Sequence, residues 1–382
     1  MVEAASTNQL GWLNSLVKQY DAHVSDAVLL AARIGDIKSL ELLTPYMDEL
    51  KDVKREAFEE VVLAASKSGN ADVVRLLLPE LGGEGLAWSV IKIAAGKGFM
   101  EILSFAADAA ECGYEMSYVL LHAIHSRQSE AAIFLASRYY REWNLGEGLE
   151  KALVYGLNEV AECIYGVITR EGQETSFHEF FVYLGGDGYS HALMYLYRRG
   201  HNDPKLLGLA LDDAARGGQI NVLRMLVNTG RITQDRIGET LWTTVRFGKG
   251  SSVEFLVNNS NISTQAMNRA FEDARKIEIS KFLYTKLSNP AEFVVTAFRN
   301  AAGCGRYTLM SDKERVAIVK FLRSTGFVPD KLVCDAFTVA IEKWYTEGVV
   351  LTLCNEACIS FEIAIEAFQK AVSVGKTKVM KL

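Results

Sequence analysis

The stretch Ala214-Ala215-Arg216-Gly217-Gly218, followed by apolar residues at Ile220, Val222, Leu223 and Leu226, carries the pattern that decides the fold of this 382-residue chain. The same order of two small residues, two variable residues, a glycine and an apolar segment returns at Ala31-Ala32-Arg33-Ile34-Gly35 and at Ala94-Ala95-Gly96-Lys97-Gly98. A helix pair of this length cannot bury its own apolar face, so successive copies must stack and share one core. The sequence therefore predicts an all-α helical-repeat solenoid.

The glycine that ends the pattern serves as an anchor for aligning the copies. Equivalent positions recur at steps of about 27 to 34 residues, at Gly35, Gly69, Gly98, Arg127, Gly156, Gly188, Gly218, Gly248 and Arg275. Four residues earlier, six copies carry an alanine, which lets paired helices approach closely: Ala31, Ala65, Ala94, Ala123, Ala152 and Ala214. Glycine suits a helix end that needs a left-handed residue, so Arg127 and Arg275 predict turns that are strained or differently built.

We predict one repeat domain over residues 1–382, built from eleven or twelve helix pairs. Residues 1–24 are expected to hold an N-terminal capping helix, residues 25–300 the regular repeats, and residues 301–382 looser C-terminal repeats. An insertion near residues 303–312 separates two matching helices. In a stacked array such an insertion emerges as a loop on one edge, where function often lies.

Set beside known repeats, the pattern resembles the ankyrin repeat, with its best copies at 31–43, 65–77, 94–103 and 214–226. The Thr-Pro-Leu-His opening of ankyrin repeats is absent and the period is mostly shorter, so short loops between helix pairs are expected. The resemblance implies protein binding on a concave face formed by the first helices. On that face it places the variable residues just before each anchor.

Those variable positions give the candidate partner-binding residues. Carried over copy by copy, they are Arg33, Lys67, Lys97, His125, Tyr155, Arg216, Arg246 and Phe247. Basic residues at successive copies would form a basic ladder along the groove, with Tyr155 and Phe247 as aromatic anchors. An alternative stays open, because Lys and Arg near helix C-termini also offset the helix macrodipole without any role in binding.

Composition narrows the class of partner. The chain has 41 Lys and Arg against 47 Asp and Glu, a formal net charge of -6, which argues against nucleic-acid binding because phosphate neutralisation needs clustered bases. No long apolar run or targeting segment is evident, and the six cysteines are dispersed, so we expect no membrane association and a cytoplasmic location. The expected partner is another protein with an acidic surface, and a monomer is favoured.

No catalytic, cofactor-binding or metal-ligating residues are predicted. His122 and His125 lie three residues apart on one expected helix, but no further ligand accompanies them. Gly375-Lys376-Thr377 lacks the earlier glycine of a phosphate-binding loop, because Lys370 stands in that place. The chain is therefore not expected to be an enzyme or to hold a cofactor.

The sequence thus favours a non-catalytic scaffold for protein–protein interaction. One alternative is a secreted pathogen or parasite effector of the same fold, which would act on a host protein in the host cytoplasm. A second is an enzyme or metal-binding protein that uses the helical stack as a frame, with His122, His125 or the 303–312 insertion near its site.

Overall fold

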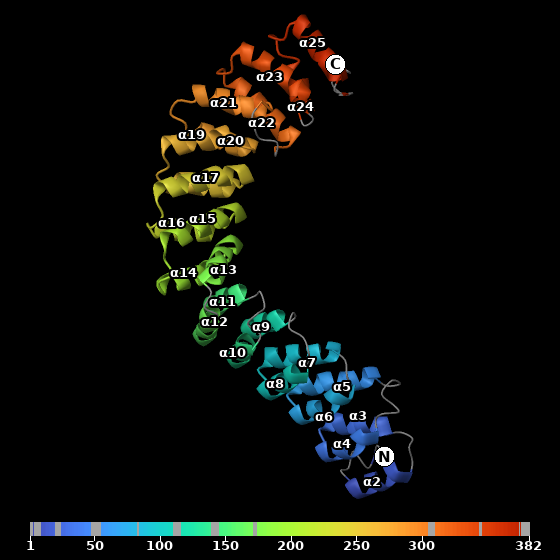
Figure 1. Cartoon of the computed structure of the whole chain (residues 1–382). Coiled ribbons are helices and arrows are strands. Elements are labelled where there is room, and N and C mark those ends of the chain that lie inside the picture. Colours follow the sequence, from blue (N-terminus) through green and yellow to red (C-terminus); the bar gives the residue numbers. More distant parts are fainter. Residues whose placement is uncertain are drawn as a thin grey trace. The chain divides into compact units, whose positions relative to one another are not determined.

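The structure, a computed structural model, describes residues 9–19, 24–46, 55–81, 84–109, 116–138, 145–170, 174–304, 310–343 and 346–373, together with residues 3 and 375. These residues form 24 α-helices and one 3-10 helix, with no strand among them (Figure 1). The predicted all-α class is confirmed. The chain divides into two compact units, Met1–Phe177 and His178–Leu382, and the boundary falls within α13 (Glu174–Asp187). The single domain over 1–382 stays a prediction.

Unit 1 is a stack of five helix pairs behind one additional helix. That helix is α2 (Leu10–Gln19), and the pairs are α3 (Val24–Ile34) with α4 (Ile37–Leu43), α5 (Arg55–Ser68) with α6 (Ala71–Leu81), α7 (Glu84–Lys97) with α8 (Met100–Ala109), α9 (Met116–His125) with α10 (Ser129–Arg138), and α11 (Leu145–Val154) with α12 (Asn158–Arg170). The 3-10 helix η1 (Thr44–Tyr46) follows α4. First helices pack on first helices and second helices on second helices, which gives two layers. Helix α2 packs on α4 in the place predicted for the cap.

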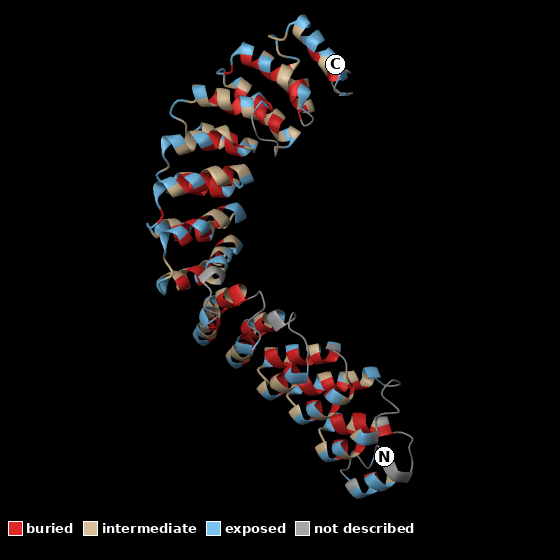
Figure 2. Cartoon of the chain, viewed as in Figure 1, coloured by how far each residue is buried: buried red, intermediate tan, exposed pale blue. Residues whose placement is uncertain are grey.

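Unit 2 continues the same architecture with six pairs and a last helix. The pairs are α13 with α14 (Ser190–Arg198), α15 (Pro204–Gly217) with α16 (Ile220–Asn228), α17 (Gln234–Phe247) with α18 (Gly250–Asn259), α19 (Thr264–Glu272) with α20 (Ile277–Tyr284), α21 (Ala291–Ala301) with α22 (Asp312–Ser324), and α23 (Asp330–Glu342) with α24 (Glu347–Leu353); α25 (Phe361–Ser373) packs on α23. Buried residues lie where helices face one another, and exposed residues lie on the outer surfaces (Figure 2). Within each unit the helix pairs form the predicted helical-repeat stack.

The turn between the helices of a pair confirms the role of the anchor glycine. Seven anchor glycines have positive φ angles, which favour glycine because other residues are strained there: Gly35, Gly69, Gly98, Gly156, Gly188, Gly218 and Gly248, at 69° to 88°. The residue after the anchor donates its backbone N–H to the carbonyl of the residue four positions before the anchor. Gln219, for example, donates to Ala214 at 2.8 Å. This is the Schellman closure of a helix end. The recurring alanines are all buried.

The two anchors that are not glycine behave differently from each other. Arg127 has a φ of 58°, and no other non-glycine residue in the described chain has a positive φ. The N–H of Gln128 still bonds to the Ala123 carbonyl at 2.9 Å, so this copy keeps the common turn with a strained residue. At Arg275 the turn is built another way, because α19 already ends at Glu272. Both outcomes had been predicted as alternatives.

The connection between α21 and α22 contains the predicted insertion at 303–312, of which residues 305–309 lie outside the described residues. The fully buried guanidinium of Arg315 in α22 donates to the carbonyls of Asn300 at 3.2 Å and Ala301 at 3.0 Å, at the end of α21. Its Nε donates to the Met310 carbonyl at 3.3 Å. A cation at a helix C-terminus is stabilised by the helix dipole. Arg315 therefore holds the pair together despite the longer connection.

None of the described helices has both the length and the apolar character that crossing a bilayer requires.

Candidate functional site

All eight predicted partner-binding residues lie at the C-terminal turns of first helices. Unit 1 contributes Arg33 on α3, Lys67 on α5, Lys97 on α7, His125 on α9 and Tyr155 directly after α11; unit 2 contributes Arg216 on α15 and both Arg246 and Phe247 on α17. Six side chains are exposed, and Tyr155 and Arg246 are half-buried. We call the surface formed by these turns the first-helix face, and it is described for each unit separately.

The first-helix face of unit 1 carries cations that form no ion pair with a described residue. Arg33, Lys67 and Lys97 are exposed, and none forms an ion pair with a described residue. Local sequence explains this, because the residues three and four positions before each of them on the same helix are alanine, leucine or isoleucine. A carboxylate at either spacing would have been able to pair within the helix. These three charges remain available to a partner.

The last two predicted residues of unit 1 lie against each other. The rings of His125 and Tyr155 meet edge to face, with centroids 5.6 Å apart and planes at 70°. Arg127, the strained anchor, places its guanidinium carbon 5.9 Å from the Tyr155 ring centroid. Nδ1 of His125 lies 2.7 Å from the Leu121 carbonyl oxygen. The structure thus joins two predicted residues from successive copies into one aromatic contact.

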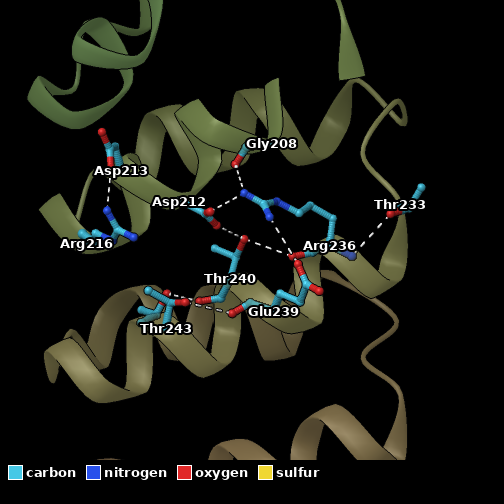
Figure 3. Close-up of polar contacts among 10 residues, drawn as sticks. Gly208, Asp212, Asp213, Arg216, Thr233, Arg236, Glu239, Thr240 and Thr243 are labelled. Carbon is cyan, nitrogen blue, oxygen red and sulfur yellow. Dashed lines mark hydrogen bonds and ion pairs between the residues drawn. The ribbon is translucent and has the colours of Figure 1, made fainter. Parts of the chain in front are cut away.

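In unit 2 a polar network ties α15 to α17 (Figure 3). The Asp212 carboxylate accepts from the guanidinium of Arg236 and from the hydroxyl of Thr240. Arg236 also pairs with Glu239 at 3.2 Å. Asp212 is mostly buried and Thr240 fully so, so the charges are held between the helices. The network fixes the position of one first helix against the next.

The same two helices bring Arg216 and Phe247 together. The guanidinium carbon of Arg216 lies 5.4 Å from the Phe247 ring centroid, within the range of a cation–π contact. Arg216 also pairs with Asp213 at 3.1 Å (Figure 3). Phe247 nevertheless remains 58% exposed. One face of an aromatic ring is therefore covered by a cation while much of the ring stays open to solvent.

A second cation–aromatic group lies on α17 and α19. The guanidinium carbons of Arg246 and Arg269 are 4.6 Å and 4.0 Å from the ring centroid of the half-buried Trp242. The Trp242 indole N–H donates to the Asp273 carboxylate at 2.6 Å. The turn-based alignment predicted Arg246 but missed Arg269 and Asp273. A signal existed, since Trp242 and Arg269 both stand six residues before their anchors, and equivalent positions of stacked repeats are neighbours.

The described part of the chain contains no group of three or more His, Cys, Asp or Glu side chains arranged to hold a metal ion. His122 and His125 share α9, and the ring of His122 lies over Gly96 of α7. Burial, together with the nearby charges of Lys92 and His125, lowers the pKa of His122. The pair thus lies in a cationic setting, which disfavours a bound cation.

A comparison with solved structures finds several similar chains. The chain is similar to a solved circular tandem repeat protein with novel repeat topology and enhanced subunit contact surfaces, at 17% identity, over 100% of this chain and 84% of that chain, with a TM-score of 0.19. A TM-score this low supports no argument about shape, partners or activity. No family model matches the chain, and no curated protein matches it.

Proposed function

We propose that this protein is a non-catalytic, ankyrin-like scaffold that works in the cytoplasm and binds a partner protein through its first-helix face. The expected partner presents acidic side chains to the cations of that face. Arginine and aromatic residues supply most of the binding energy in protein interfaces, and opposite charge adds orientation and rate of association.

The observation that carries the proposal is a contrast between two arginine–phenylalanine pairs in the same two repeats. In the second-helix layer, Arg224 of α16 lies over Phe255 of α18 at 5.4 Å, the same distance as Arg216 over Phe247. Phe255 is only 8% exposed, whereas Phe247 is 58% exposed. Packing explains the second-layer pair, because its ring is buried. Packing does not explain why the Phe247 ring is exposed, and partner binding would explain it.

The test compares the two pairs directly. Tagged chain carrying Arg216→Gln and Phe247→Ser is used to capture proteins from a cell lysate, beside the unchanged chain and an Arg224→Gln control. We expect a protein retained by the unchanged chain and by the control, but lost from the double variant. All three chains should unfold within about 1 kcal/mol of one another, since an exposed cation–π pair contributes about that amount or less. Equal retention by all three would overturn the proposal for this face.

A further inference from the structure

A pocket of about 560 Å³ opens between α7 and α9 in the first-helix layer of unit 1. Its lining residues are Trp88, Ser89, Lys92, Tyr118, Val119, Leu121, His122 and His125. A volume of this size lies within the usual range for binding sites of small ligands and of peptide side chains. Two features of the lining are notable: it includes the two large aromatic residues Trp88 and Tyr118, and it includes three nitrogen bases, Lys92, His122 and His125.

The aromatic residues explain why the pocket forms in this copy. Counted back from the anchors, Trp88 is ten residues before Gly98 and Tyr118 is nine residues before Arg127. At the same places in α17 and α19 stand Gly238 and Ala266, which are so close that a Cβ on Gly238 would lie 2.8 Å from the Ala266 Cβ. Two aromatic rings cannot fit into such a contact. In unit 1 they instead form walls of an open space.

The bases give the pocket its charge. Lys92 is exposed and has no ion pair with a described residue. The His122 ring is accommodated only because residue 96 is glycine, since a Cβ there would lie 2.4 Å from His122 Nε2. Burial and the charge of Lys92 lower the pKa of His122, which reports the same cationic surroundings. No carboxylate occurs among the described lining residues, and Lys92 among them attracts an anion.

The equivalent positions in unit 2, on α17 and α19, show which chemical groups fit next to one another there. Lys92 stands six residues before its anchor, as Trp242 and Arg269 do. There the Trp242 ring lies between guanidinium groups and its N–H bonds to the Asp273 carboxylate. The place of Asp273, two residues before the anchor, is taken in α9 by His125. At these two positions unit 1 therefore has bases where unit 2 has an aromatic ring and a carboxylate, and a ligand that carries both groups would complement them.

We propose that the pocket between α7 and α9 binds a segment of the partner protein that presents an aromatic ring and a carboxylate together. The ring packs against Trp88 and Tyr118, and the carboxylate pairs with Lys92. This inference rests on the proposed function, because it takes the ligand to be part of a protein, and it names the chemistry by which unit 1 recognises that protein.

The experiment uses the full chain and two acetylated, amidated hexapeptides, Gly-Ser-Phe-Glu-Gly-Ser and Gly-Ser-Phe-Gln-Gly-Ser. Dissociation constants come from ligand-observed NMR titration at low salt. We expect the glutamate peptide to bind about threefold to fivefold more tightly, the ratio that one partly exposed ion pair supplies. Lys92→Gln should abolish that ratio. Lys38→Gln should leave it unchanged, because Lys38 is exposed on α4 of the same unit but does not line the pocket.

Tyr118→Ser tests the apolar half of the pocket, and it should weaken both peptides to a similar degree. Tyr118 is 63% exposed, so the variant is expected to fold. Equal binding of the two peptides to the unchanged chain, or equal effects of Lys92→Gln and Lys38→Gln, would overturn the proposal. So would 3-phenylpropanoate binding as tightly as the glutamate peptide, which would point to a small carboxylate. The peptide titrations do not involve Arg216 or Phe247, so the two proposals can fail separately.

Discussion

The first-helix faces of the two units are built on the same turn, but they differ in the contacts that their cations make within the protein. In unit 1, Arg33, Lys67 and Lys97 extend into solvent with no ion pair to any described residue. In unit 2, Arg216 is held by Asp213 and Phe247, and Arg246 lies on Trp242. Free cations attract an acidic partner over long range and pay entropy when they are fixed. Stacked arginines have already lost that freedom, so they offer less net charge and better-defined contacts.

This contrast bears on whether the bases serve binding or helix capping. A lysine that only offsets the helix dipole needs no aromatic neighbour, and the cations of unit 1 fit that description as well as they fit a binding role. The arginines of unit 2 do more than offset a dipole, because Arg216 lies over Phe247 of the next repeat and Arg246 packs on Trp242, a ring that Arg269 of the next repeat also contacts. The comparison therefore predicts that substitutions on the two faces affect stability very differently.

The largest expected effect is that of Trp242→Ala in unit 2. The ring packs between Arg246 and Arg269 and bonds to Asp273, so its removal should lower the free energy of unfolding by about 2 to 3 kcal/mol, below the full range for a buried tryptophan because Trp242 is half-buried. Lys67→Ala, at an exposed site in unit 1, should change it by less than about 0.5 kcal/mol. Urea unfolding followed by circular dichroism measures both values.

Hydrogen exchange shows where Trp242→Ala lowers the stability. Faster exchange is expected for the backbone amides of α17 and α19. Trp242→Phe is the control, because it keeps an aromatic ring beside the arginines and removes the N–H bond to Asp273 together with the smaller ring of the indole. If Lys67→Ala lowered the free energy of unfolding as much as Trp242→Ala does, the prediction that the two faces differ in their contribution to stability would be wrong.

The turn that the two faces share could be predicted from sequence, since the anchor glycines and the alanines before them recur along the chain. The choice between the two forms expected at Arg127 and Arg275 could not, because it depends on where the preceding helix ends. Side-chain contacts between successive repeats were still harder to predict from the sequence. Arg269 lies in the last turn of α19, and its role depends on the Trp242 ring of the previous repeat. Lys92 was missed for the same reason, since its importance arises from Trp88 and Tyr118 on two different helices.

An intermediate effect is expected at the turn itself, where Arg127 of unit 1 is compared with Gly248 of unit 2. Both have positive φ, 58° and 69°, and a side chain there costs about 1 kcal/mol. Arg127→Gly should therefore stabilise the protein by about 0.5 kcal/mol after allowance for the greater freedom of unfolded glycine. Gly248→Ala should destabilise it by about 1 kcal/mol, because a Cβ there would also lie 3.1 Å from Lys276. Thermal unfolding of both variants gives the signs, and effects of equal sign would contradict a common strained turn.

The smallest effect concerns pH and the part-buried base of unit 1. Because burial, Lys92 and His125 lower the pKa of His122 in the folded chain, the unfolded chain binds that proton more tightly, with a pKa of about 6.5. Stability from this group is therefore complete above pH 6.5 and decreases as the pH falls towards the lowered pKa. His122→Gln should lose less stability than the unchanged chain between pH 7.5 and pH 5.5, as measured by urea midpoints at each pH.

Lys92→Gln should reduce the same loss in part, since it removes one of the causes. The glutamate hexapeptide should also reduce it, because a carboxylate beside Lys92 offsets the charge that disfavours protonation of His122. A pH dependence that none of the three changes would mean that burial and neighbouring charge do not act on His122 in this way.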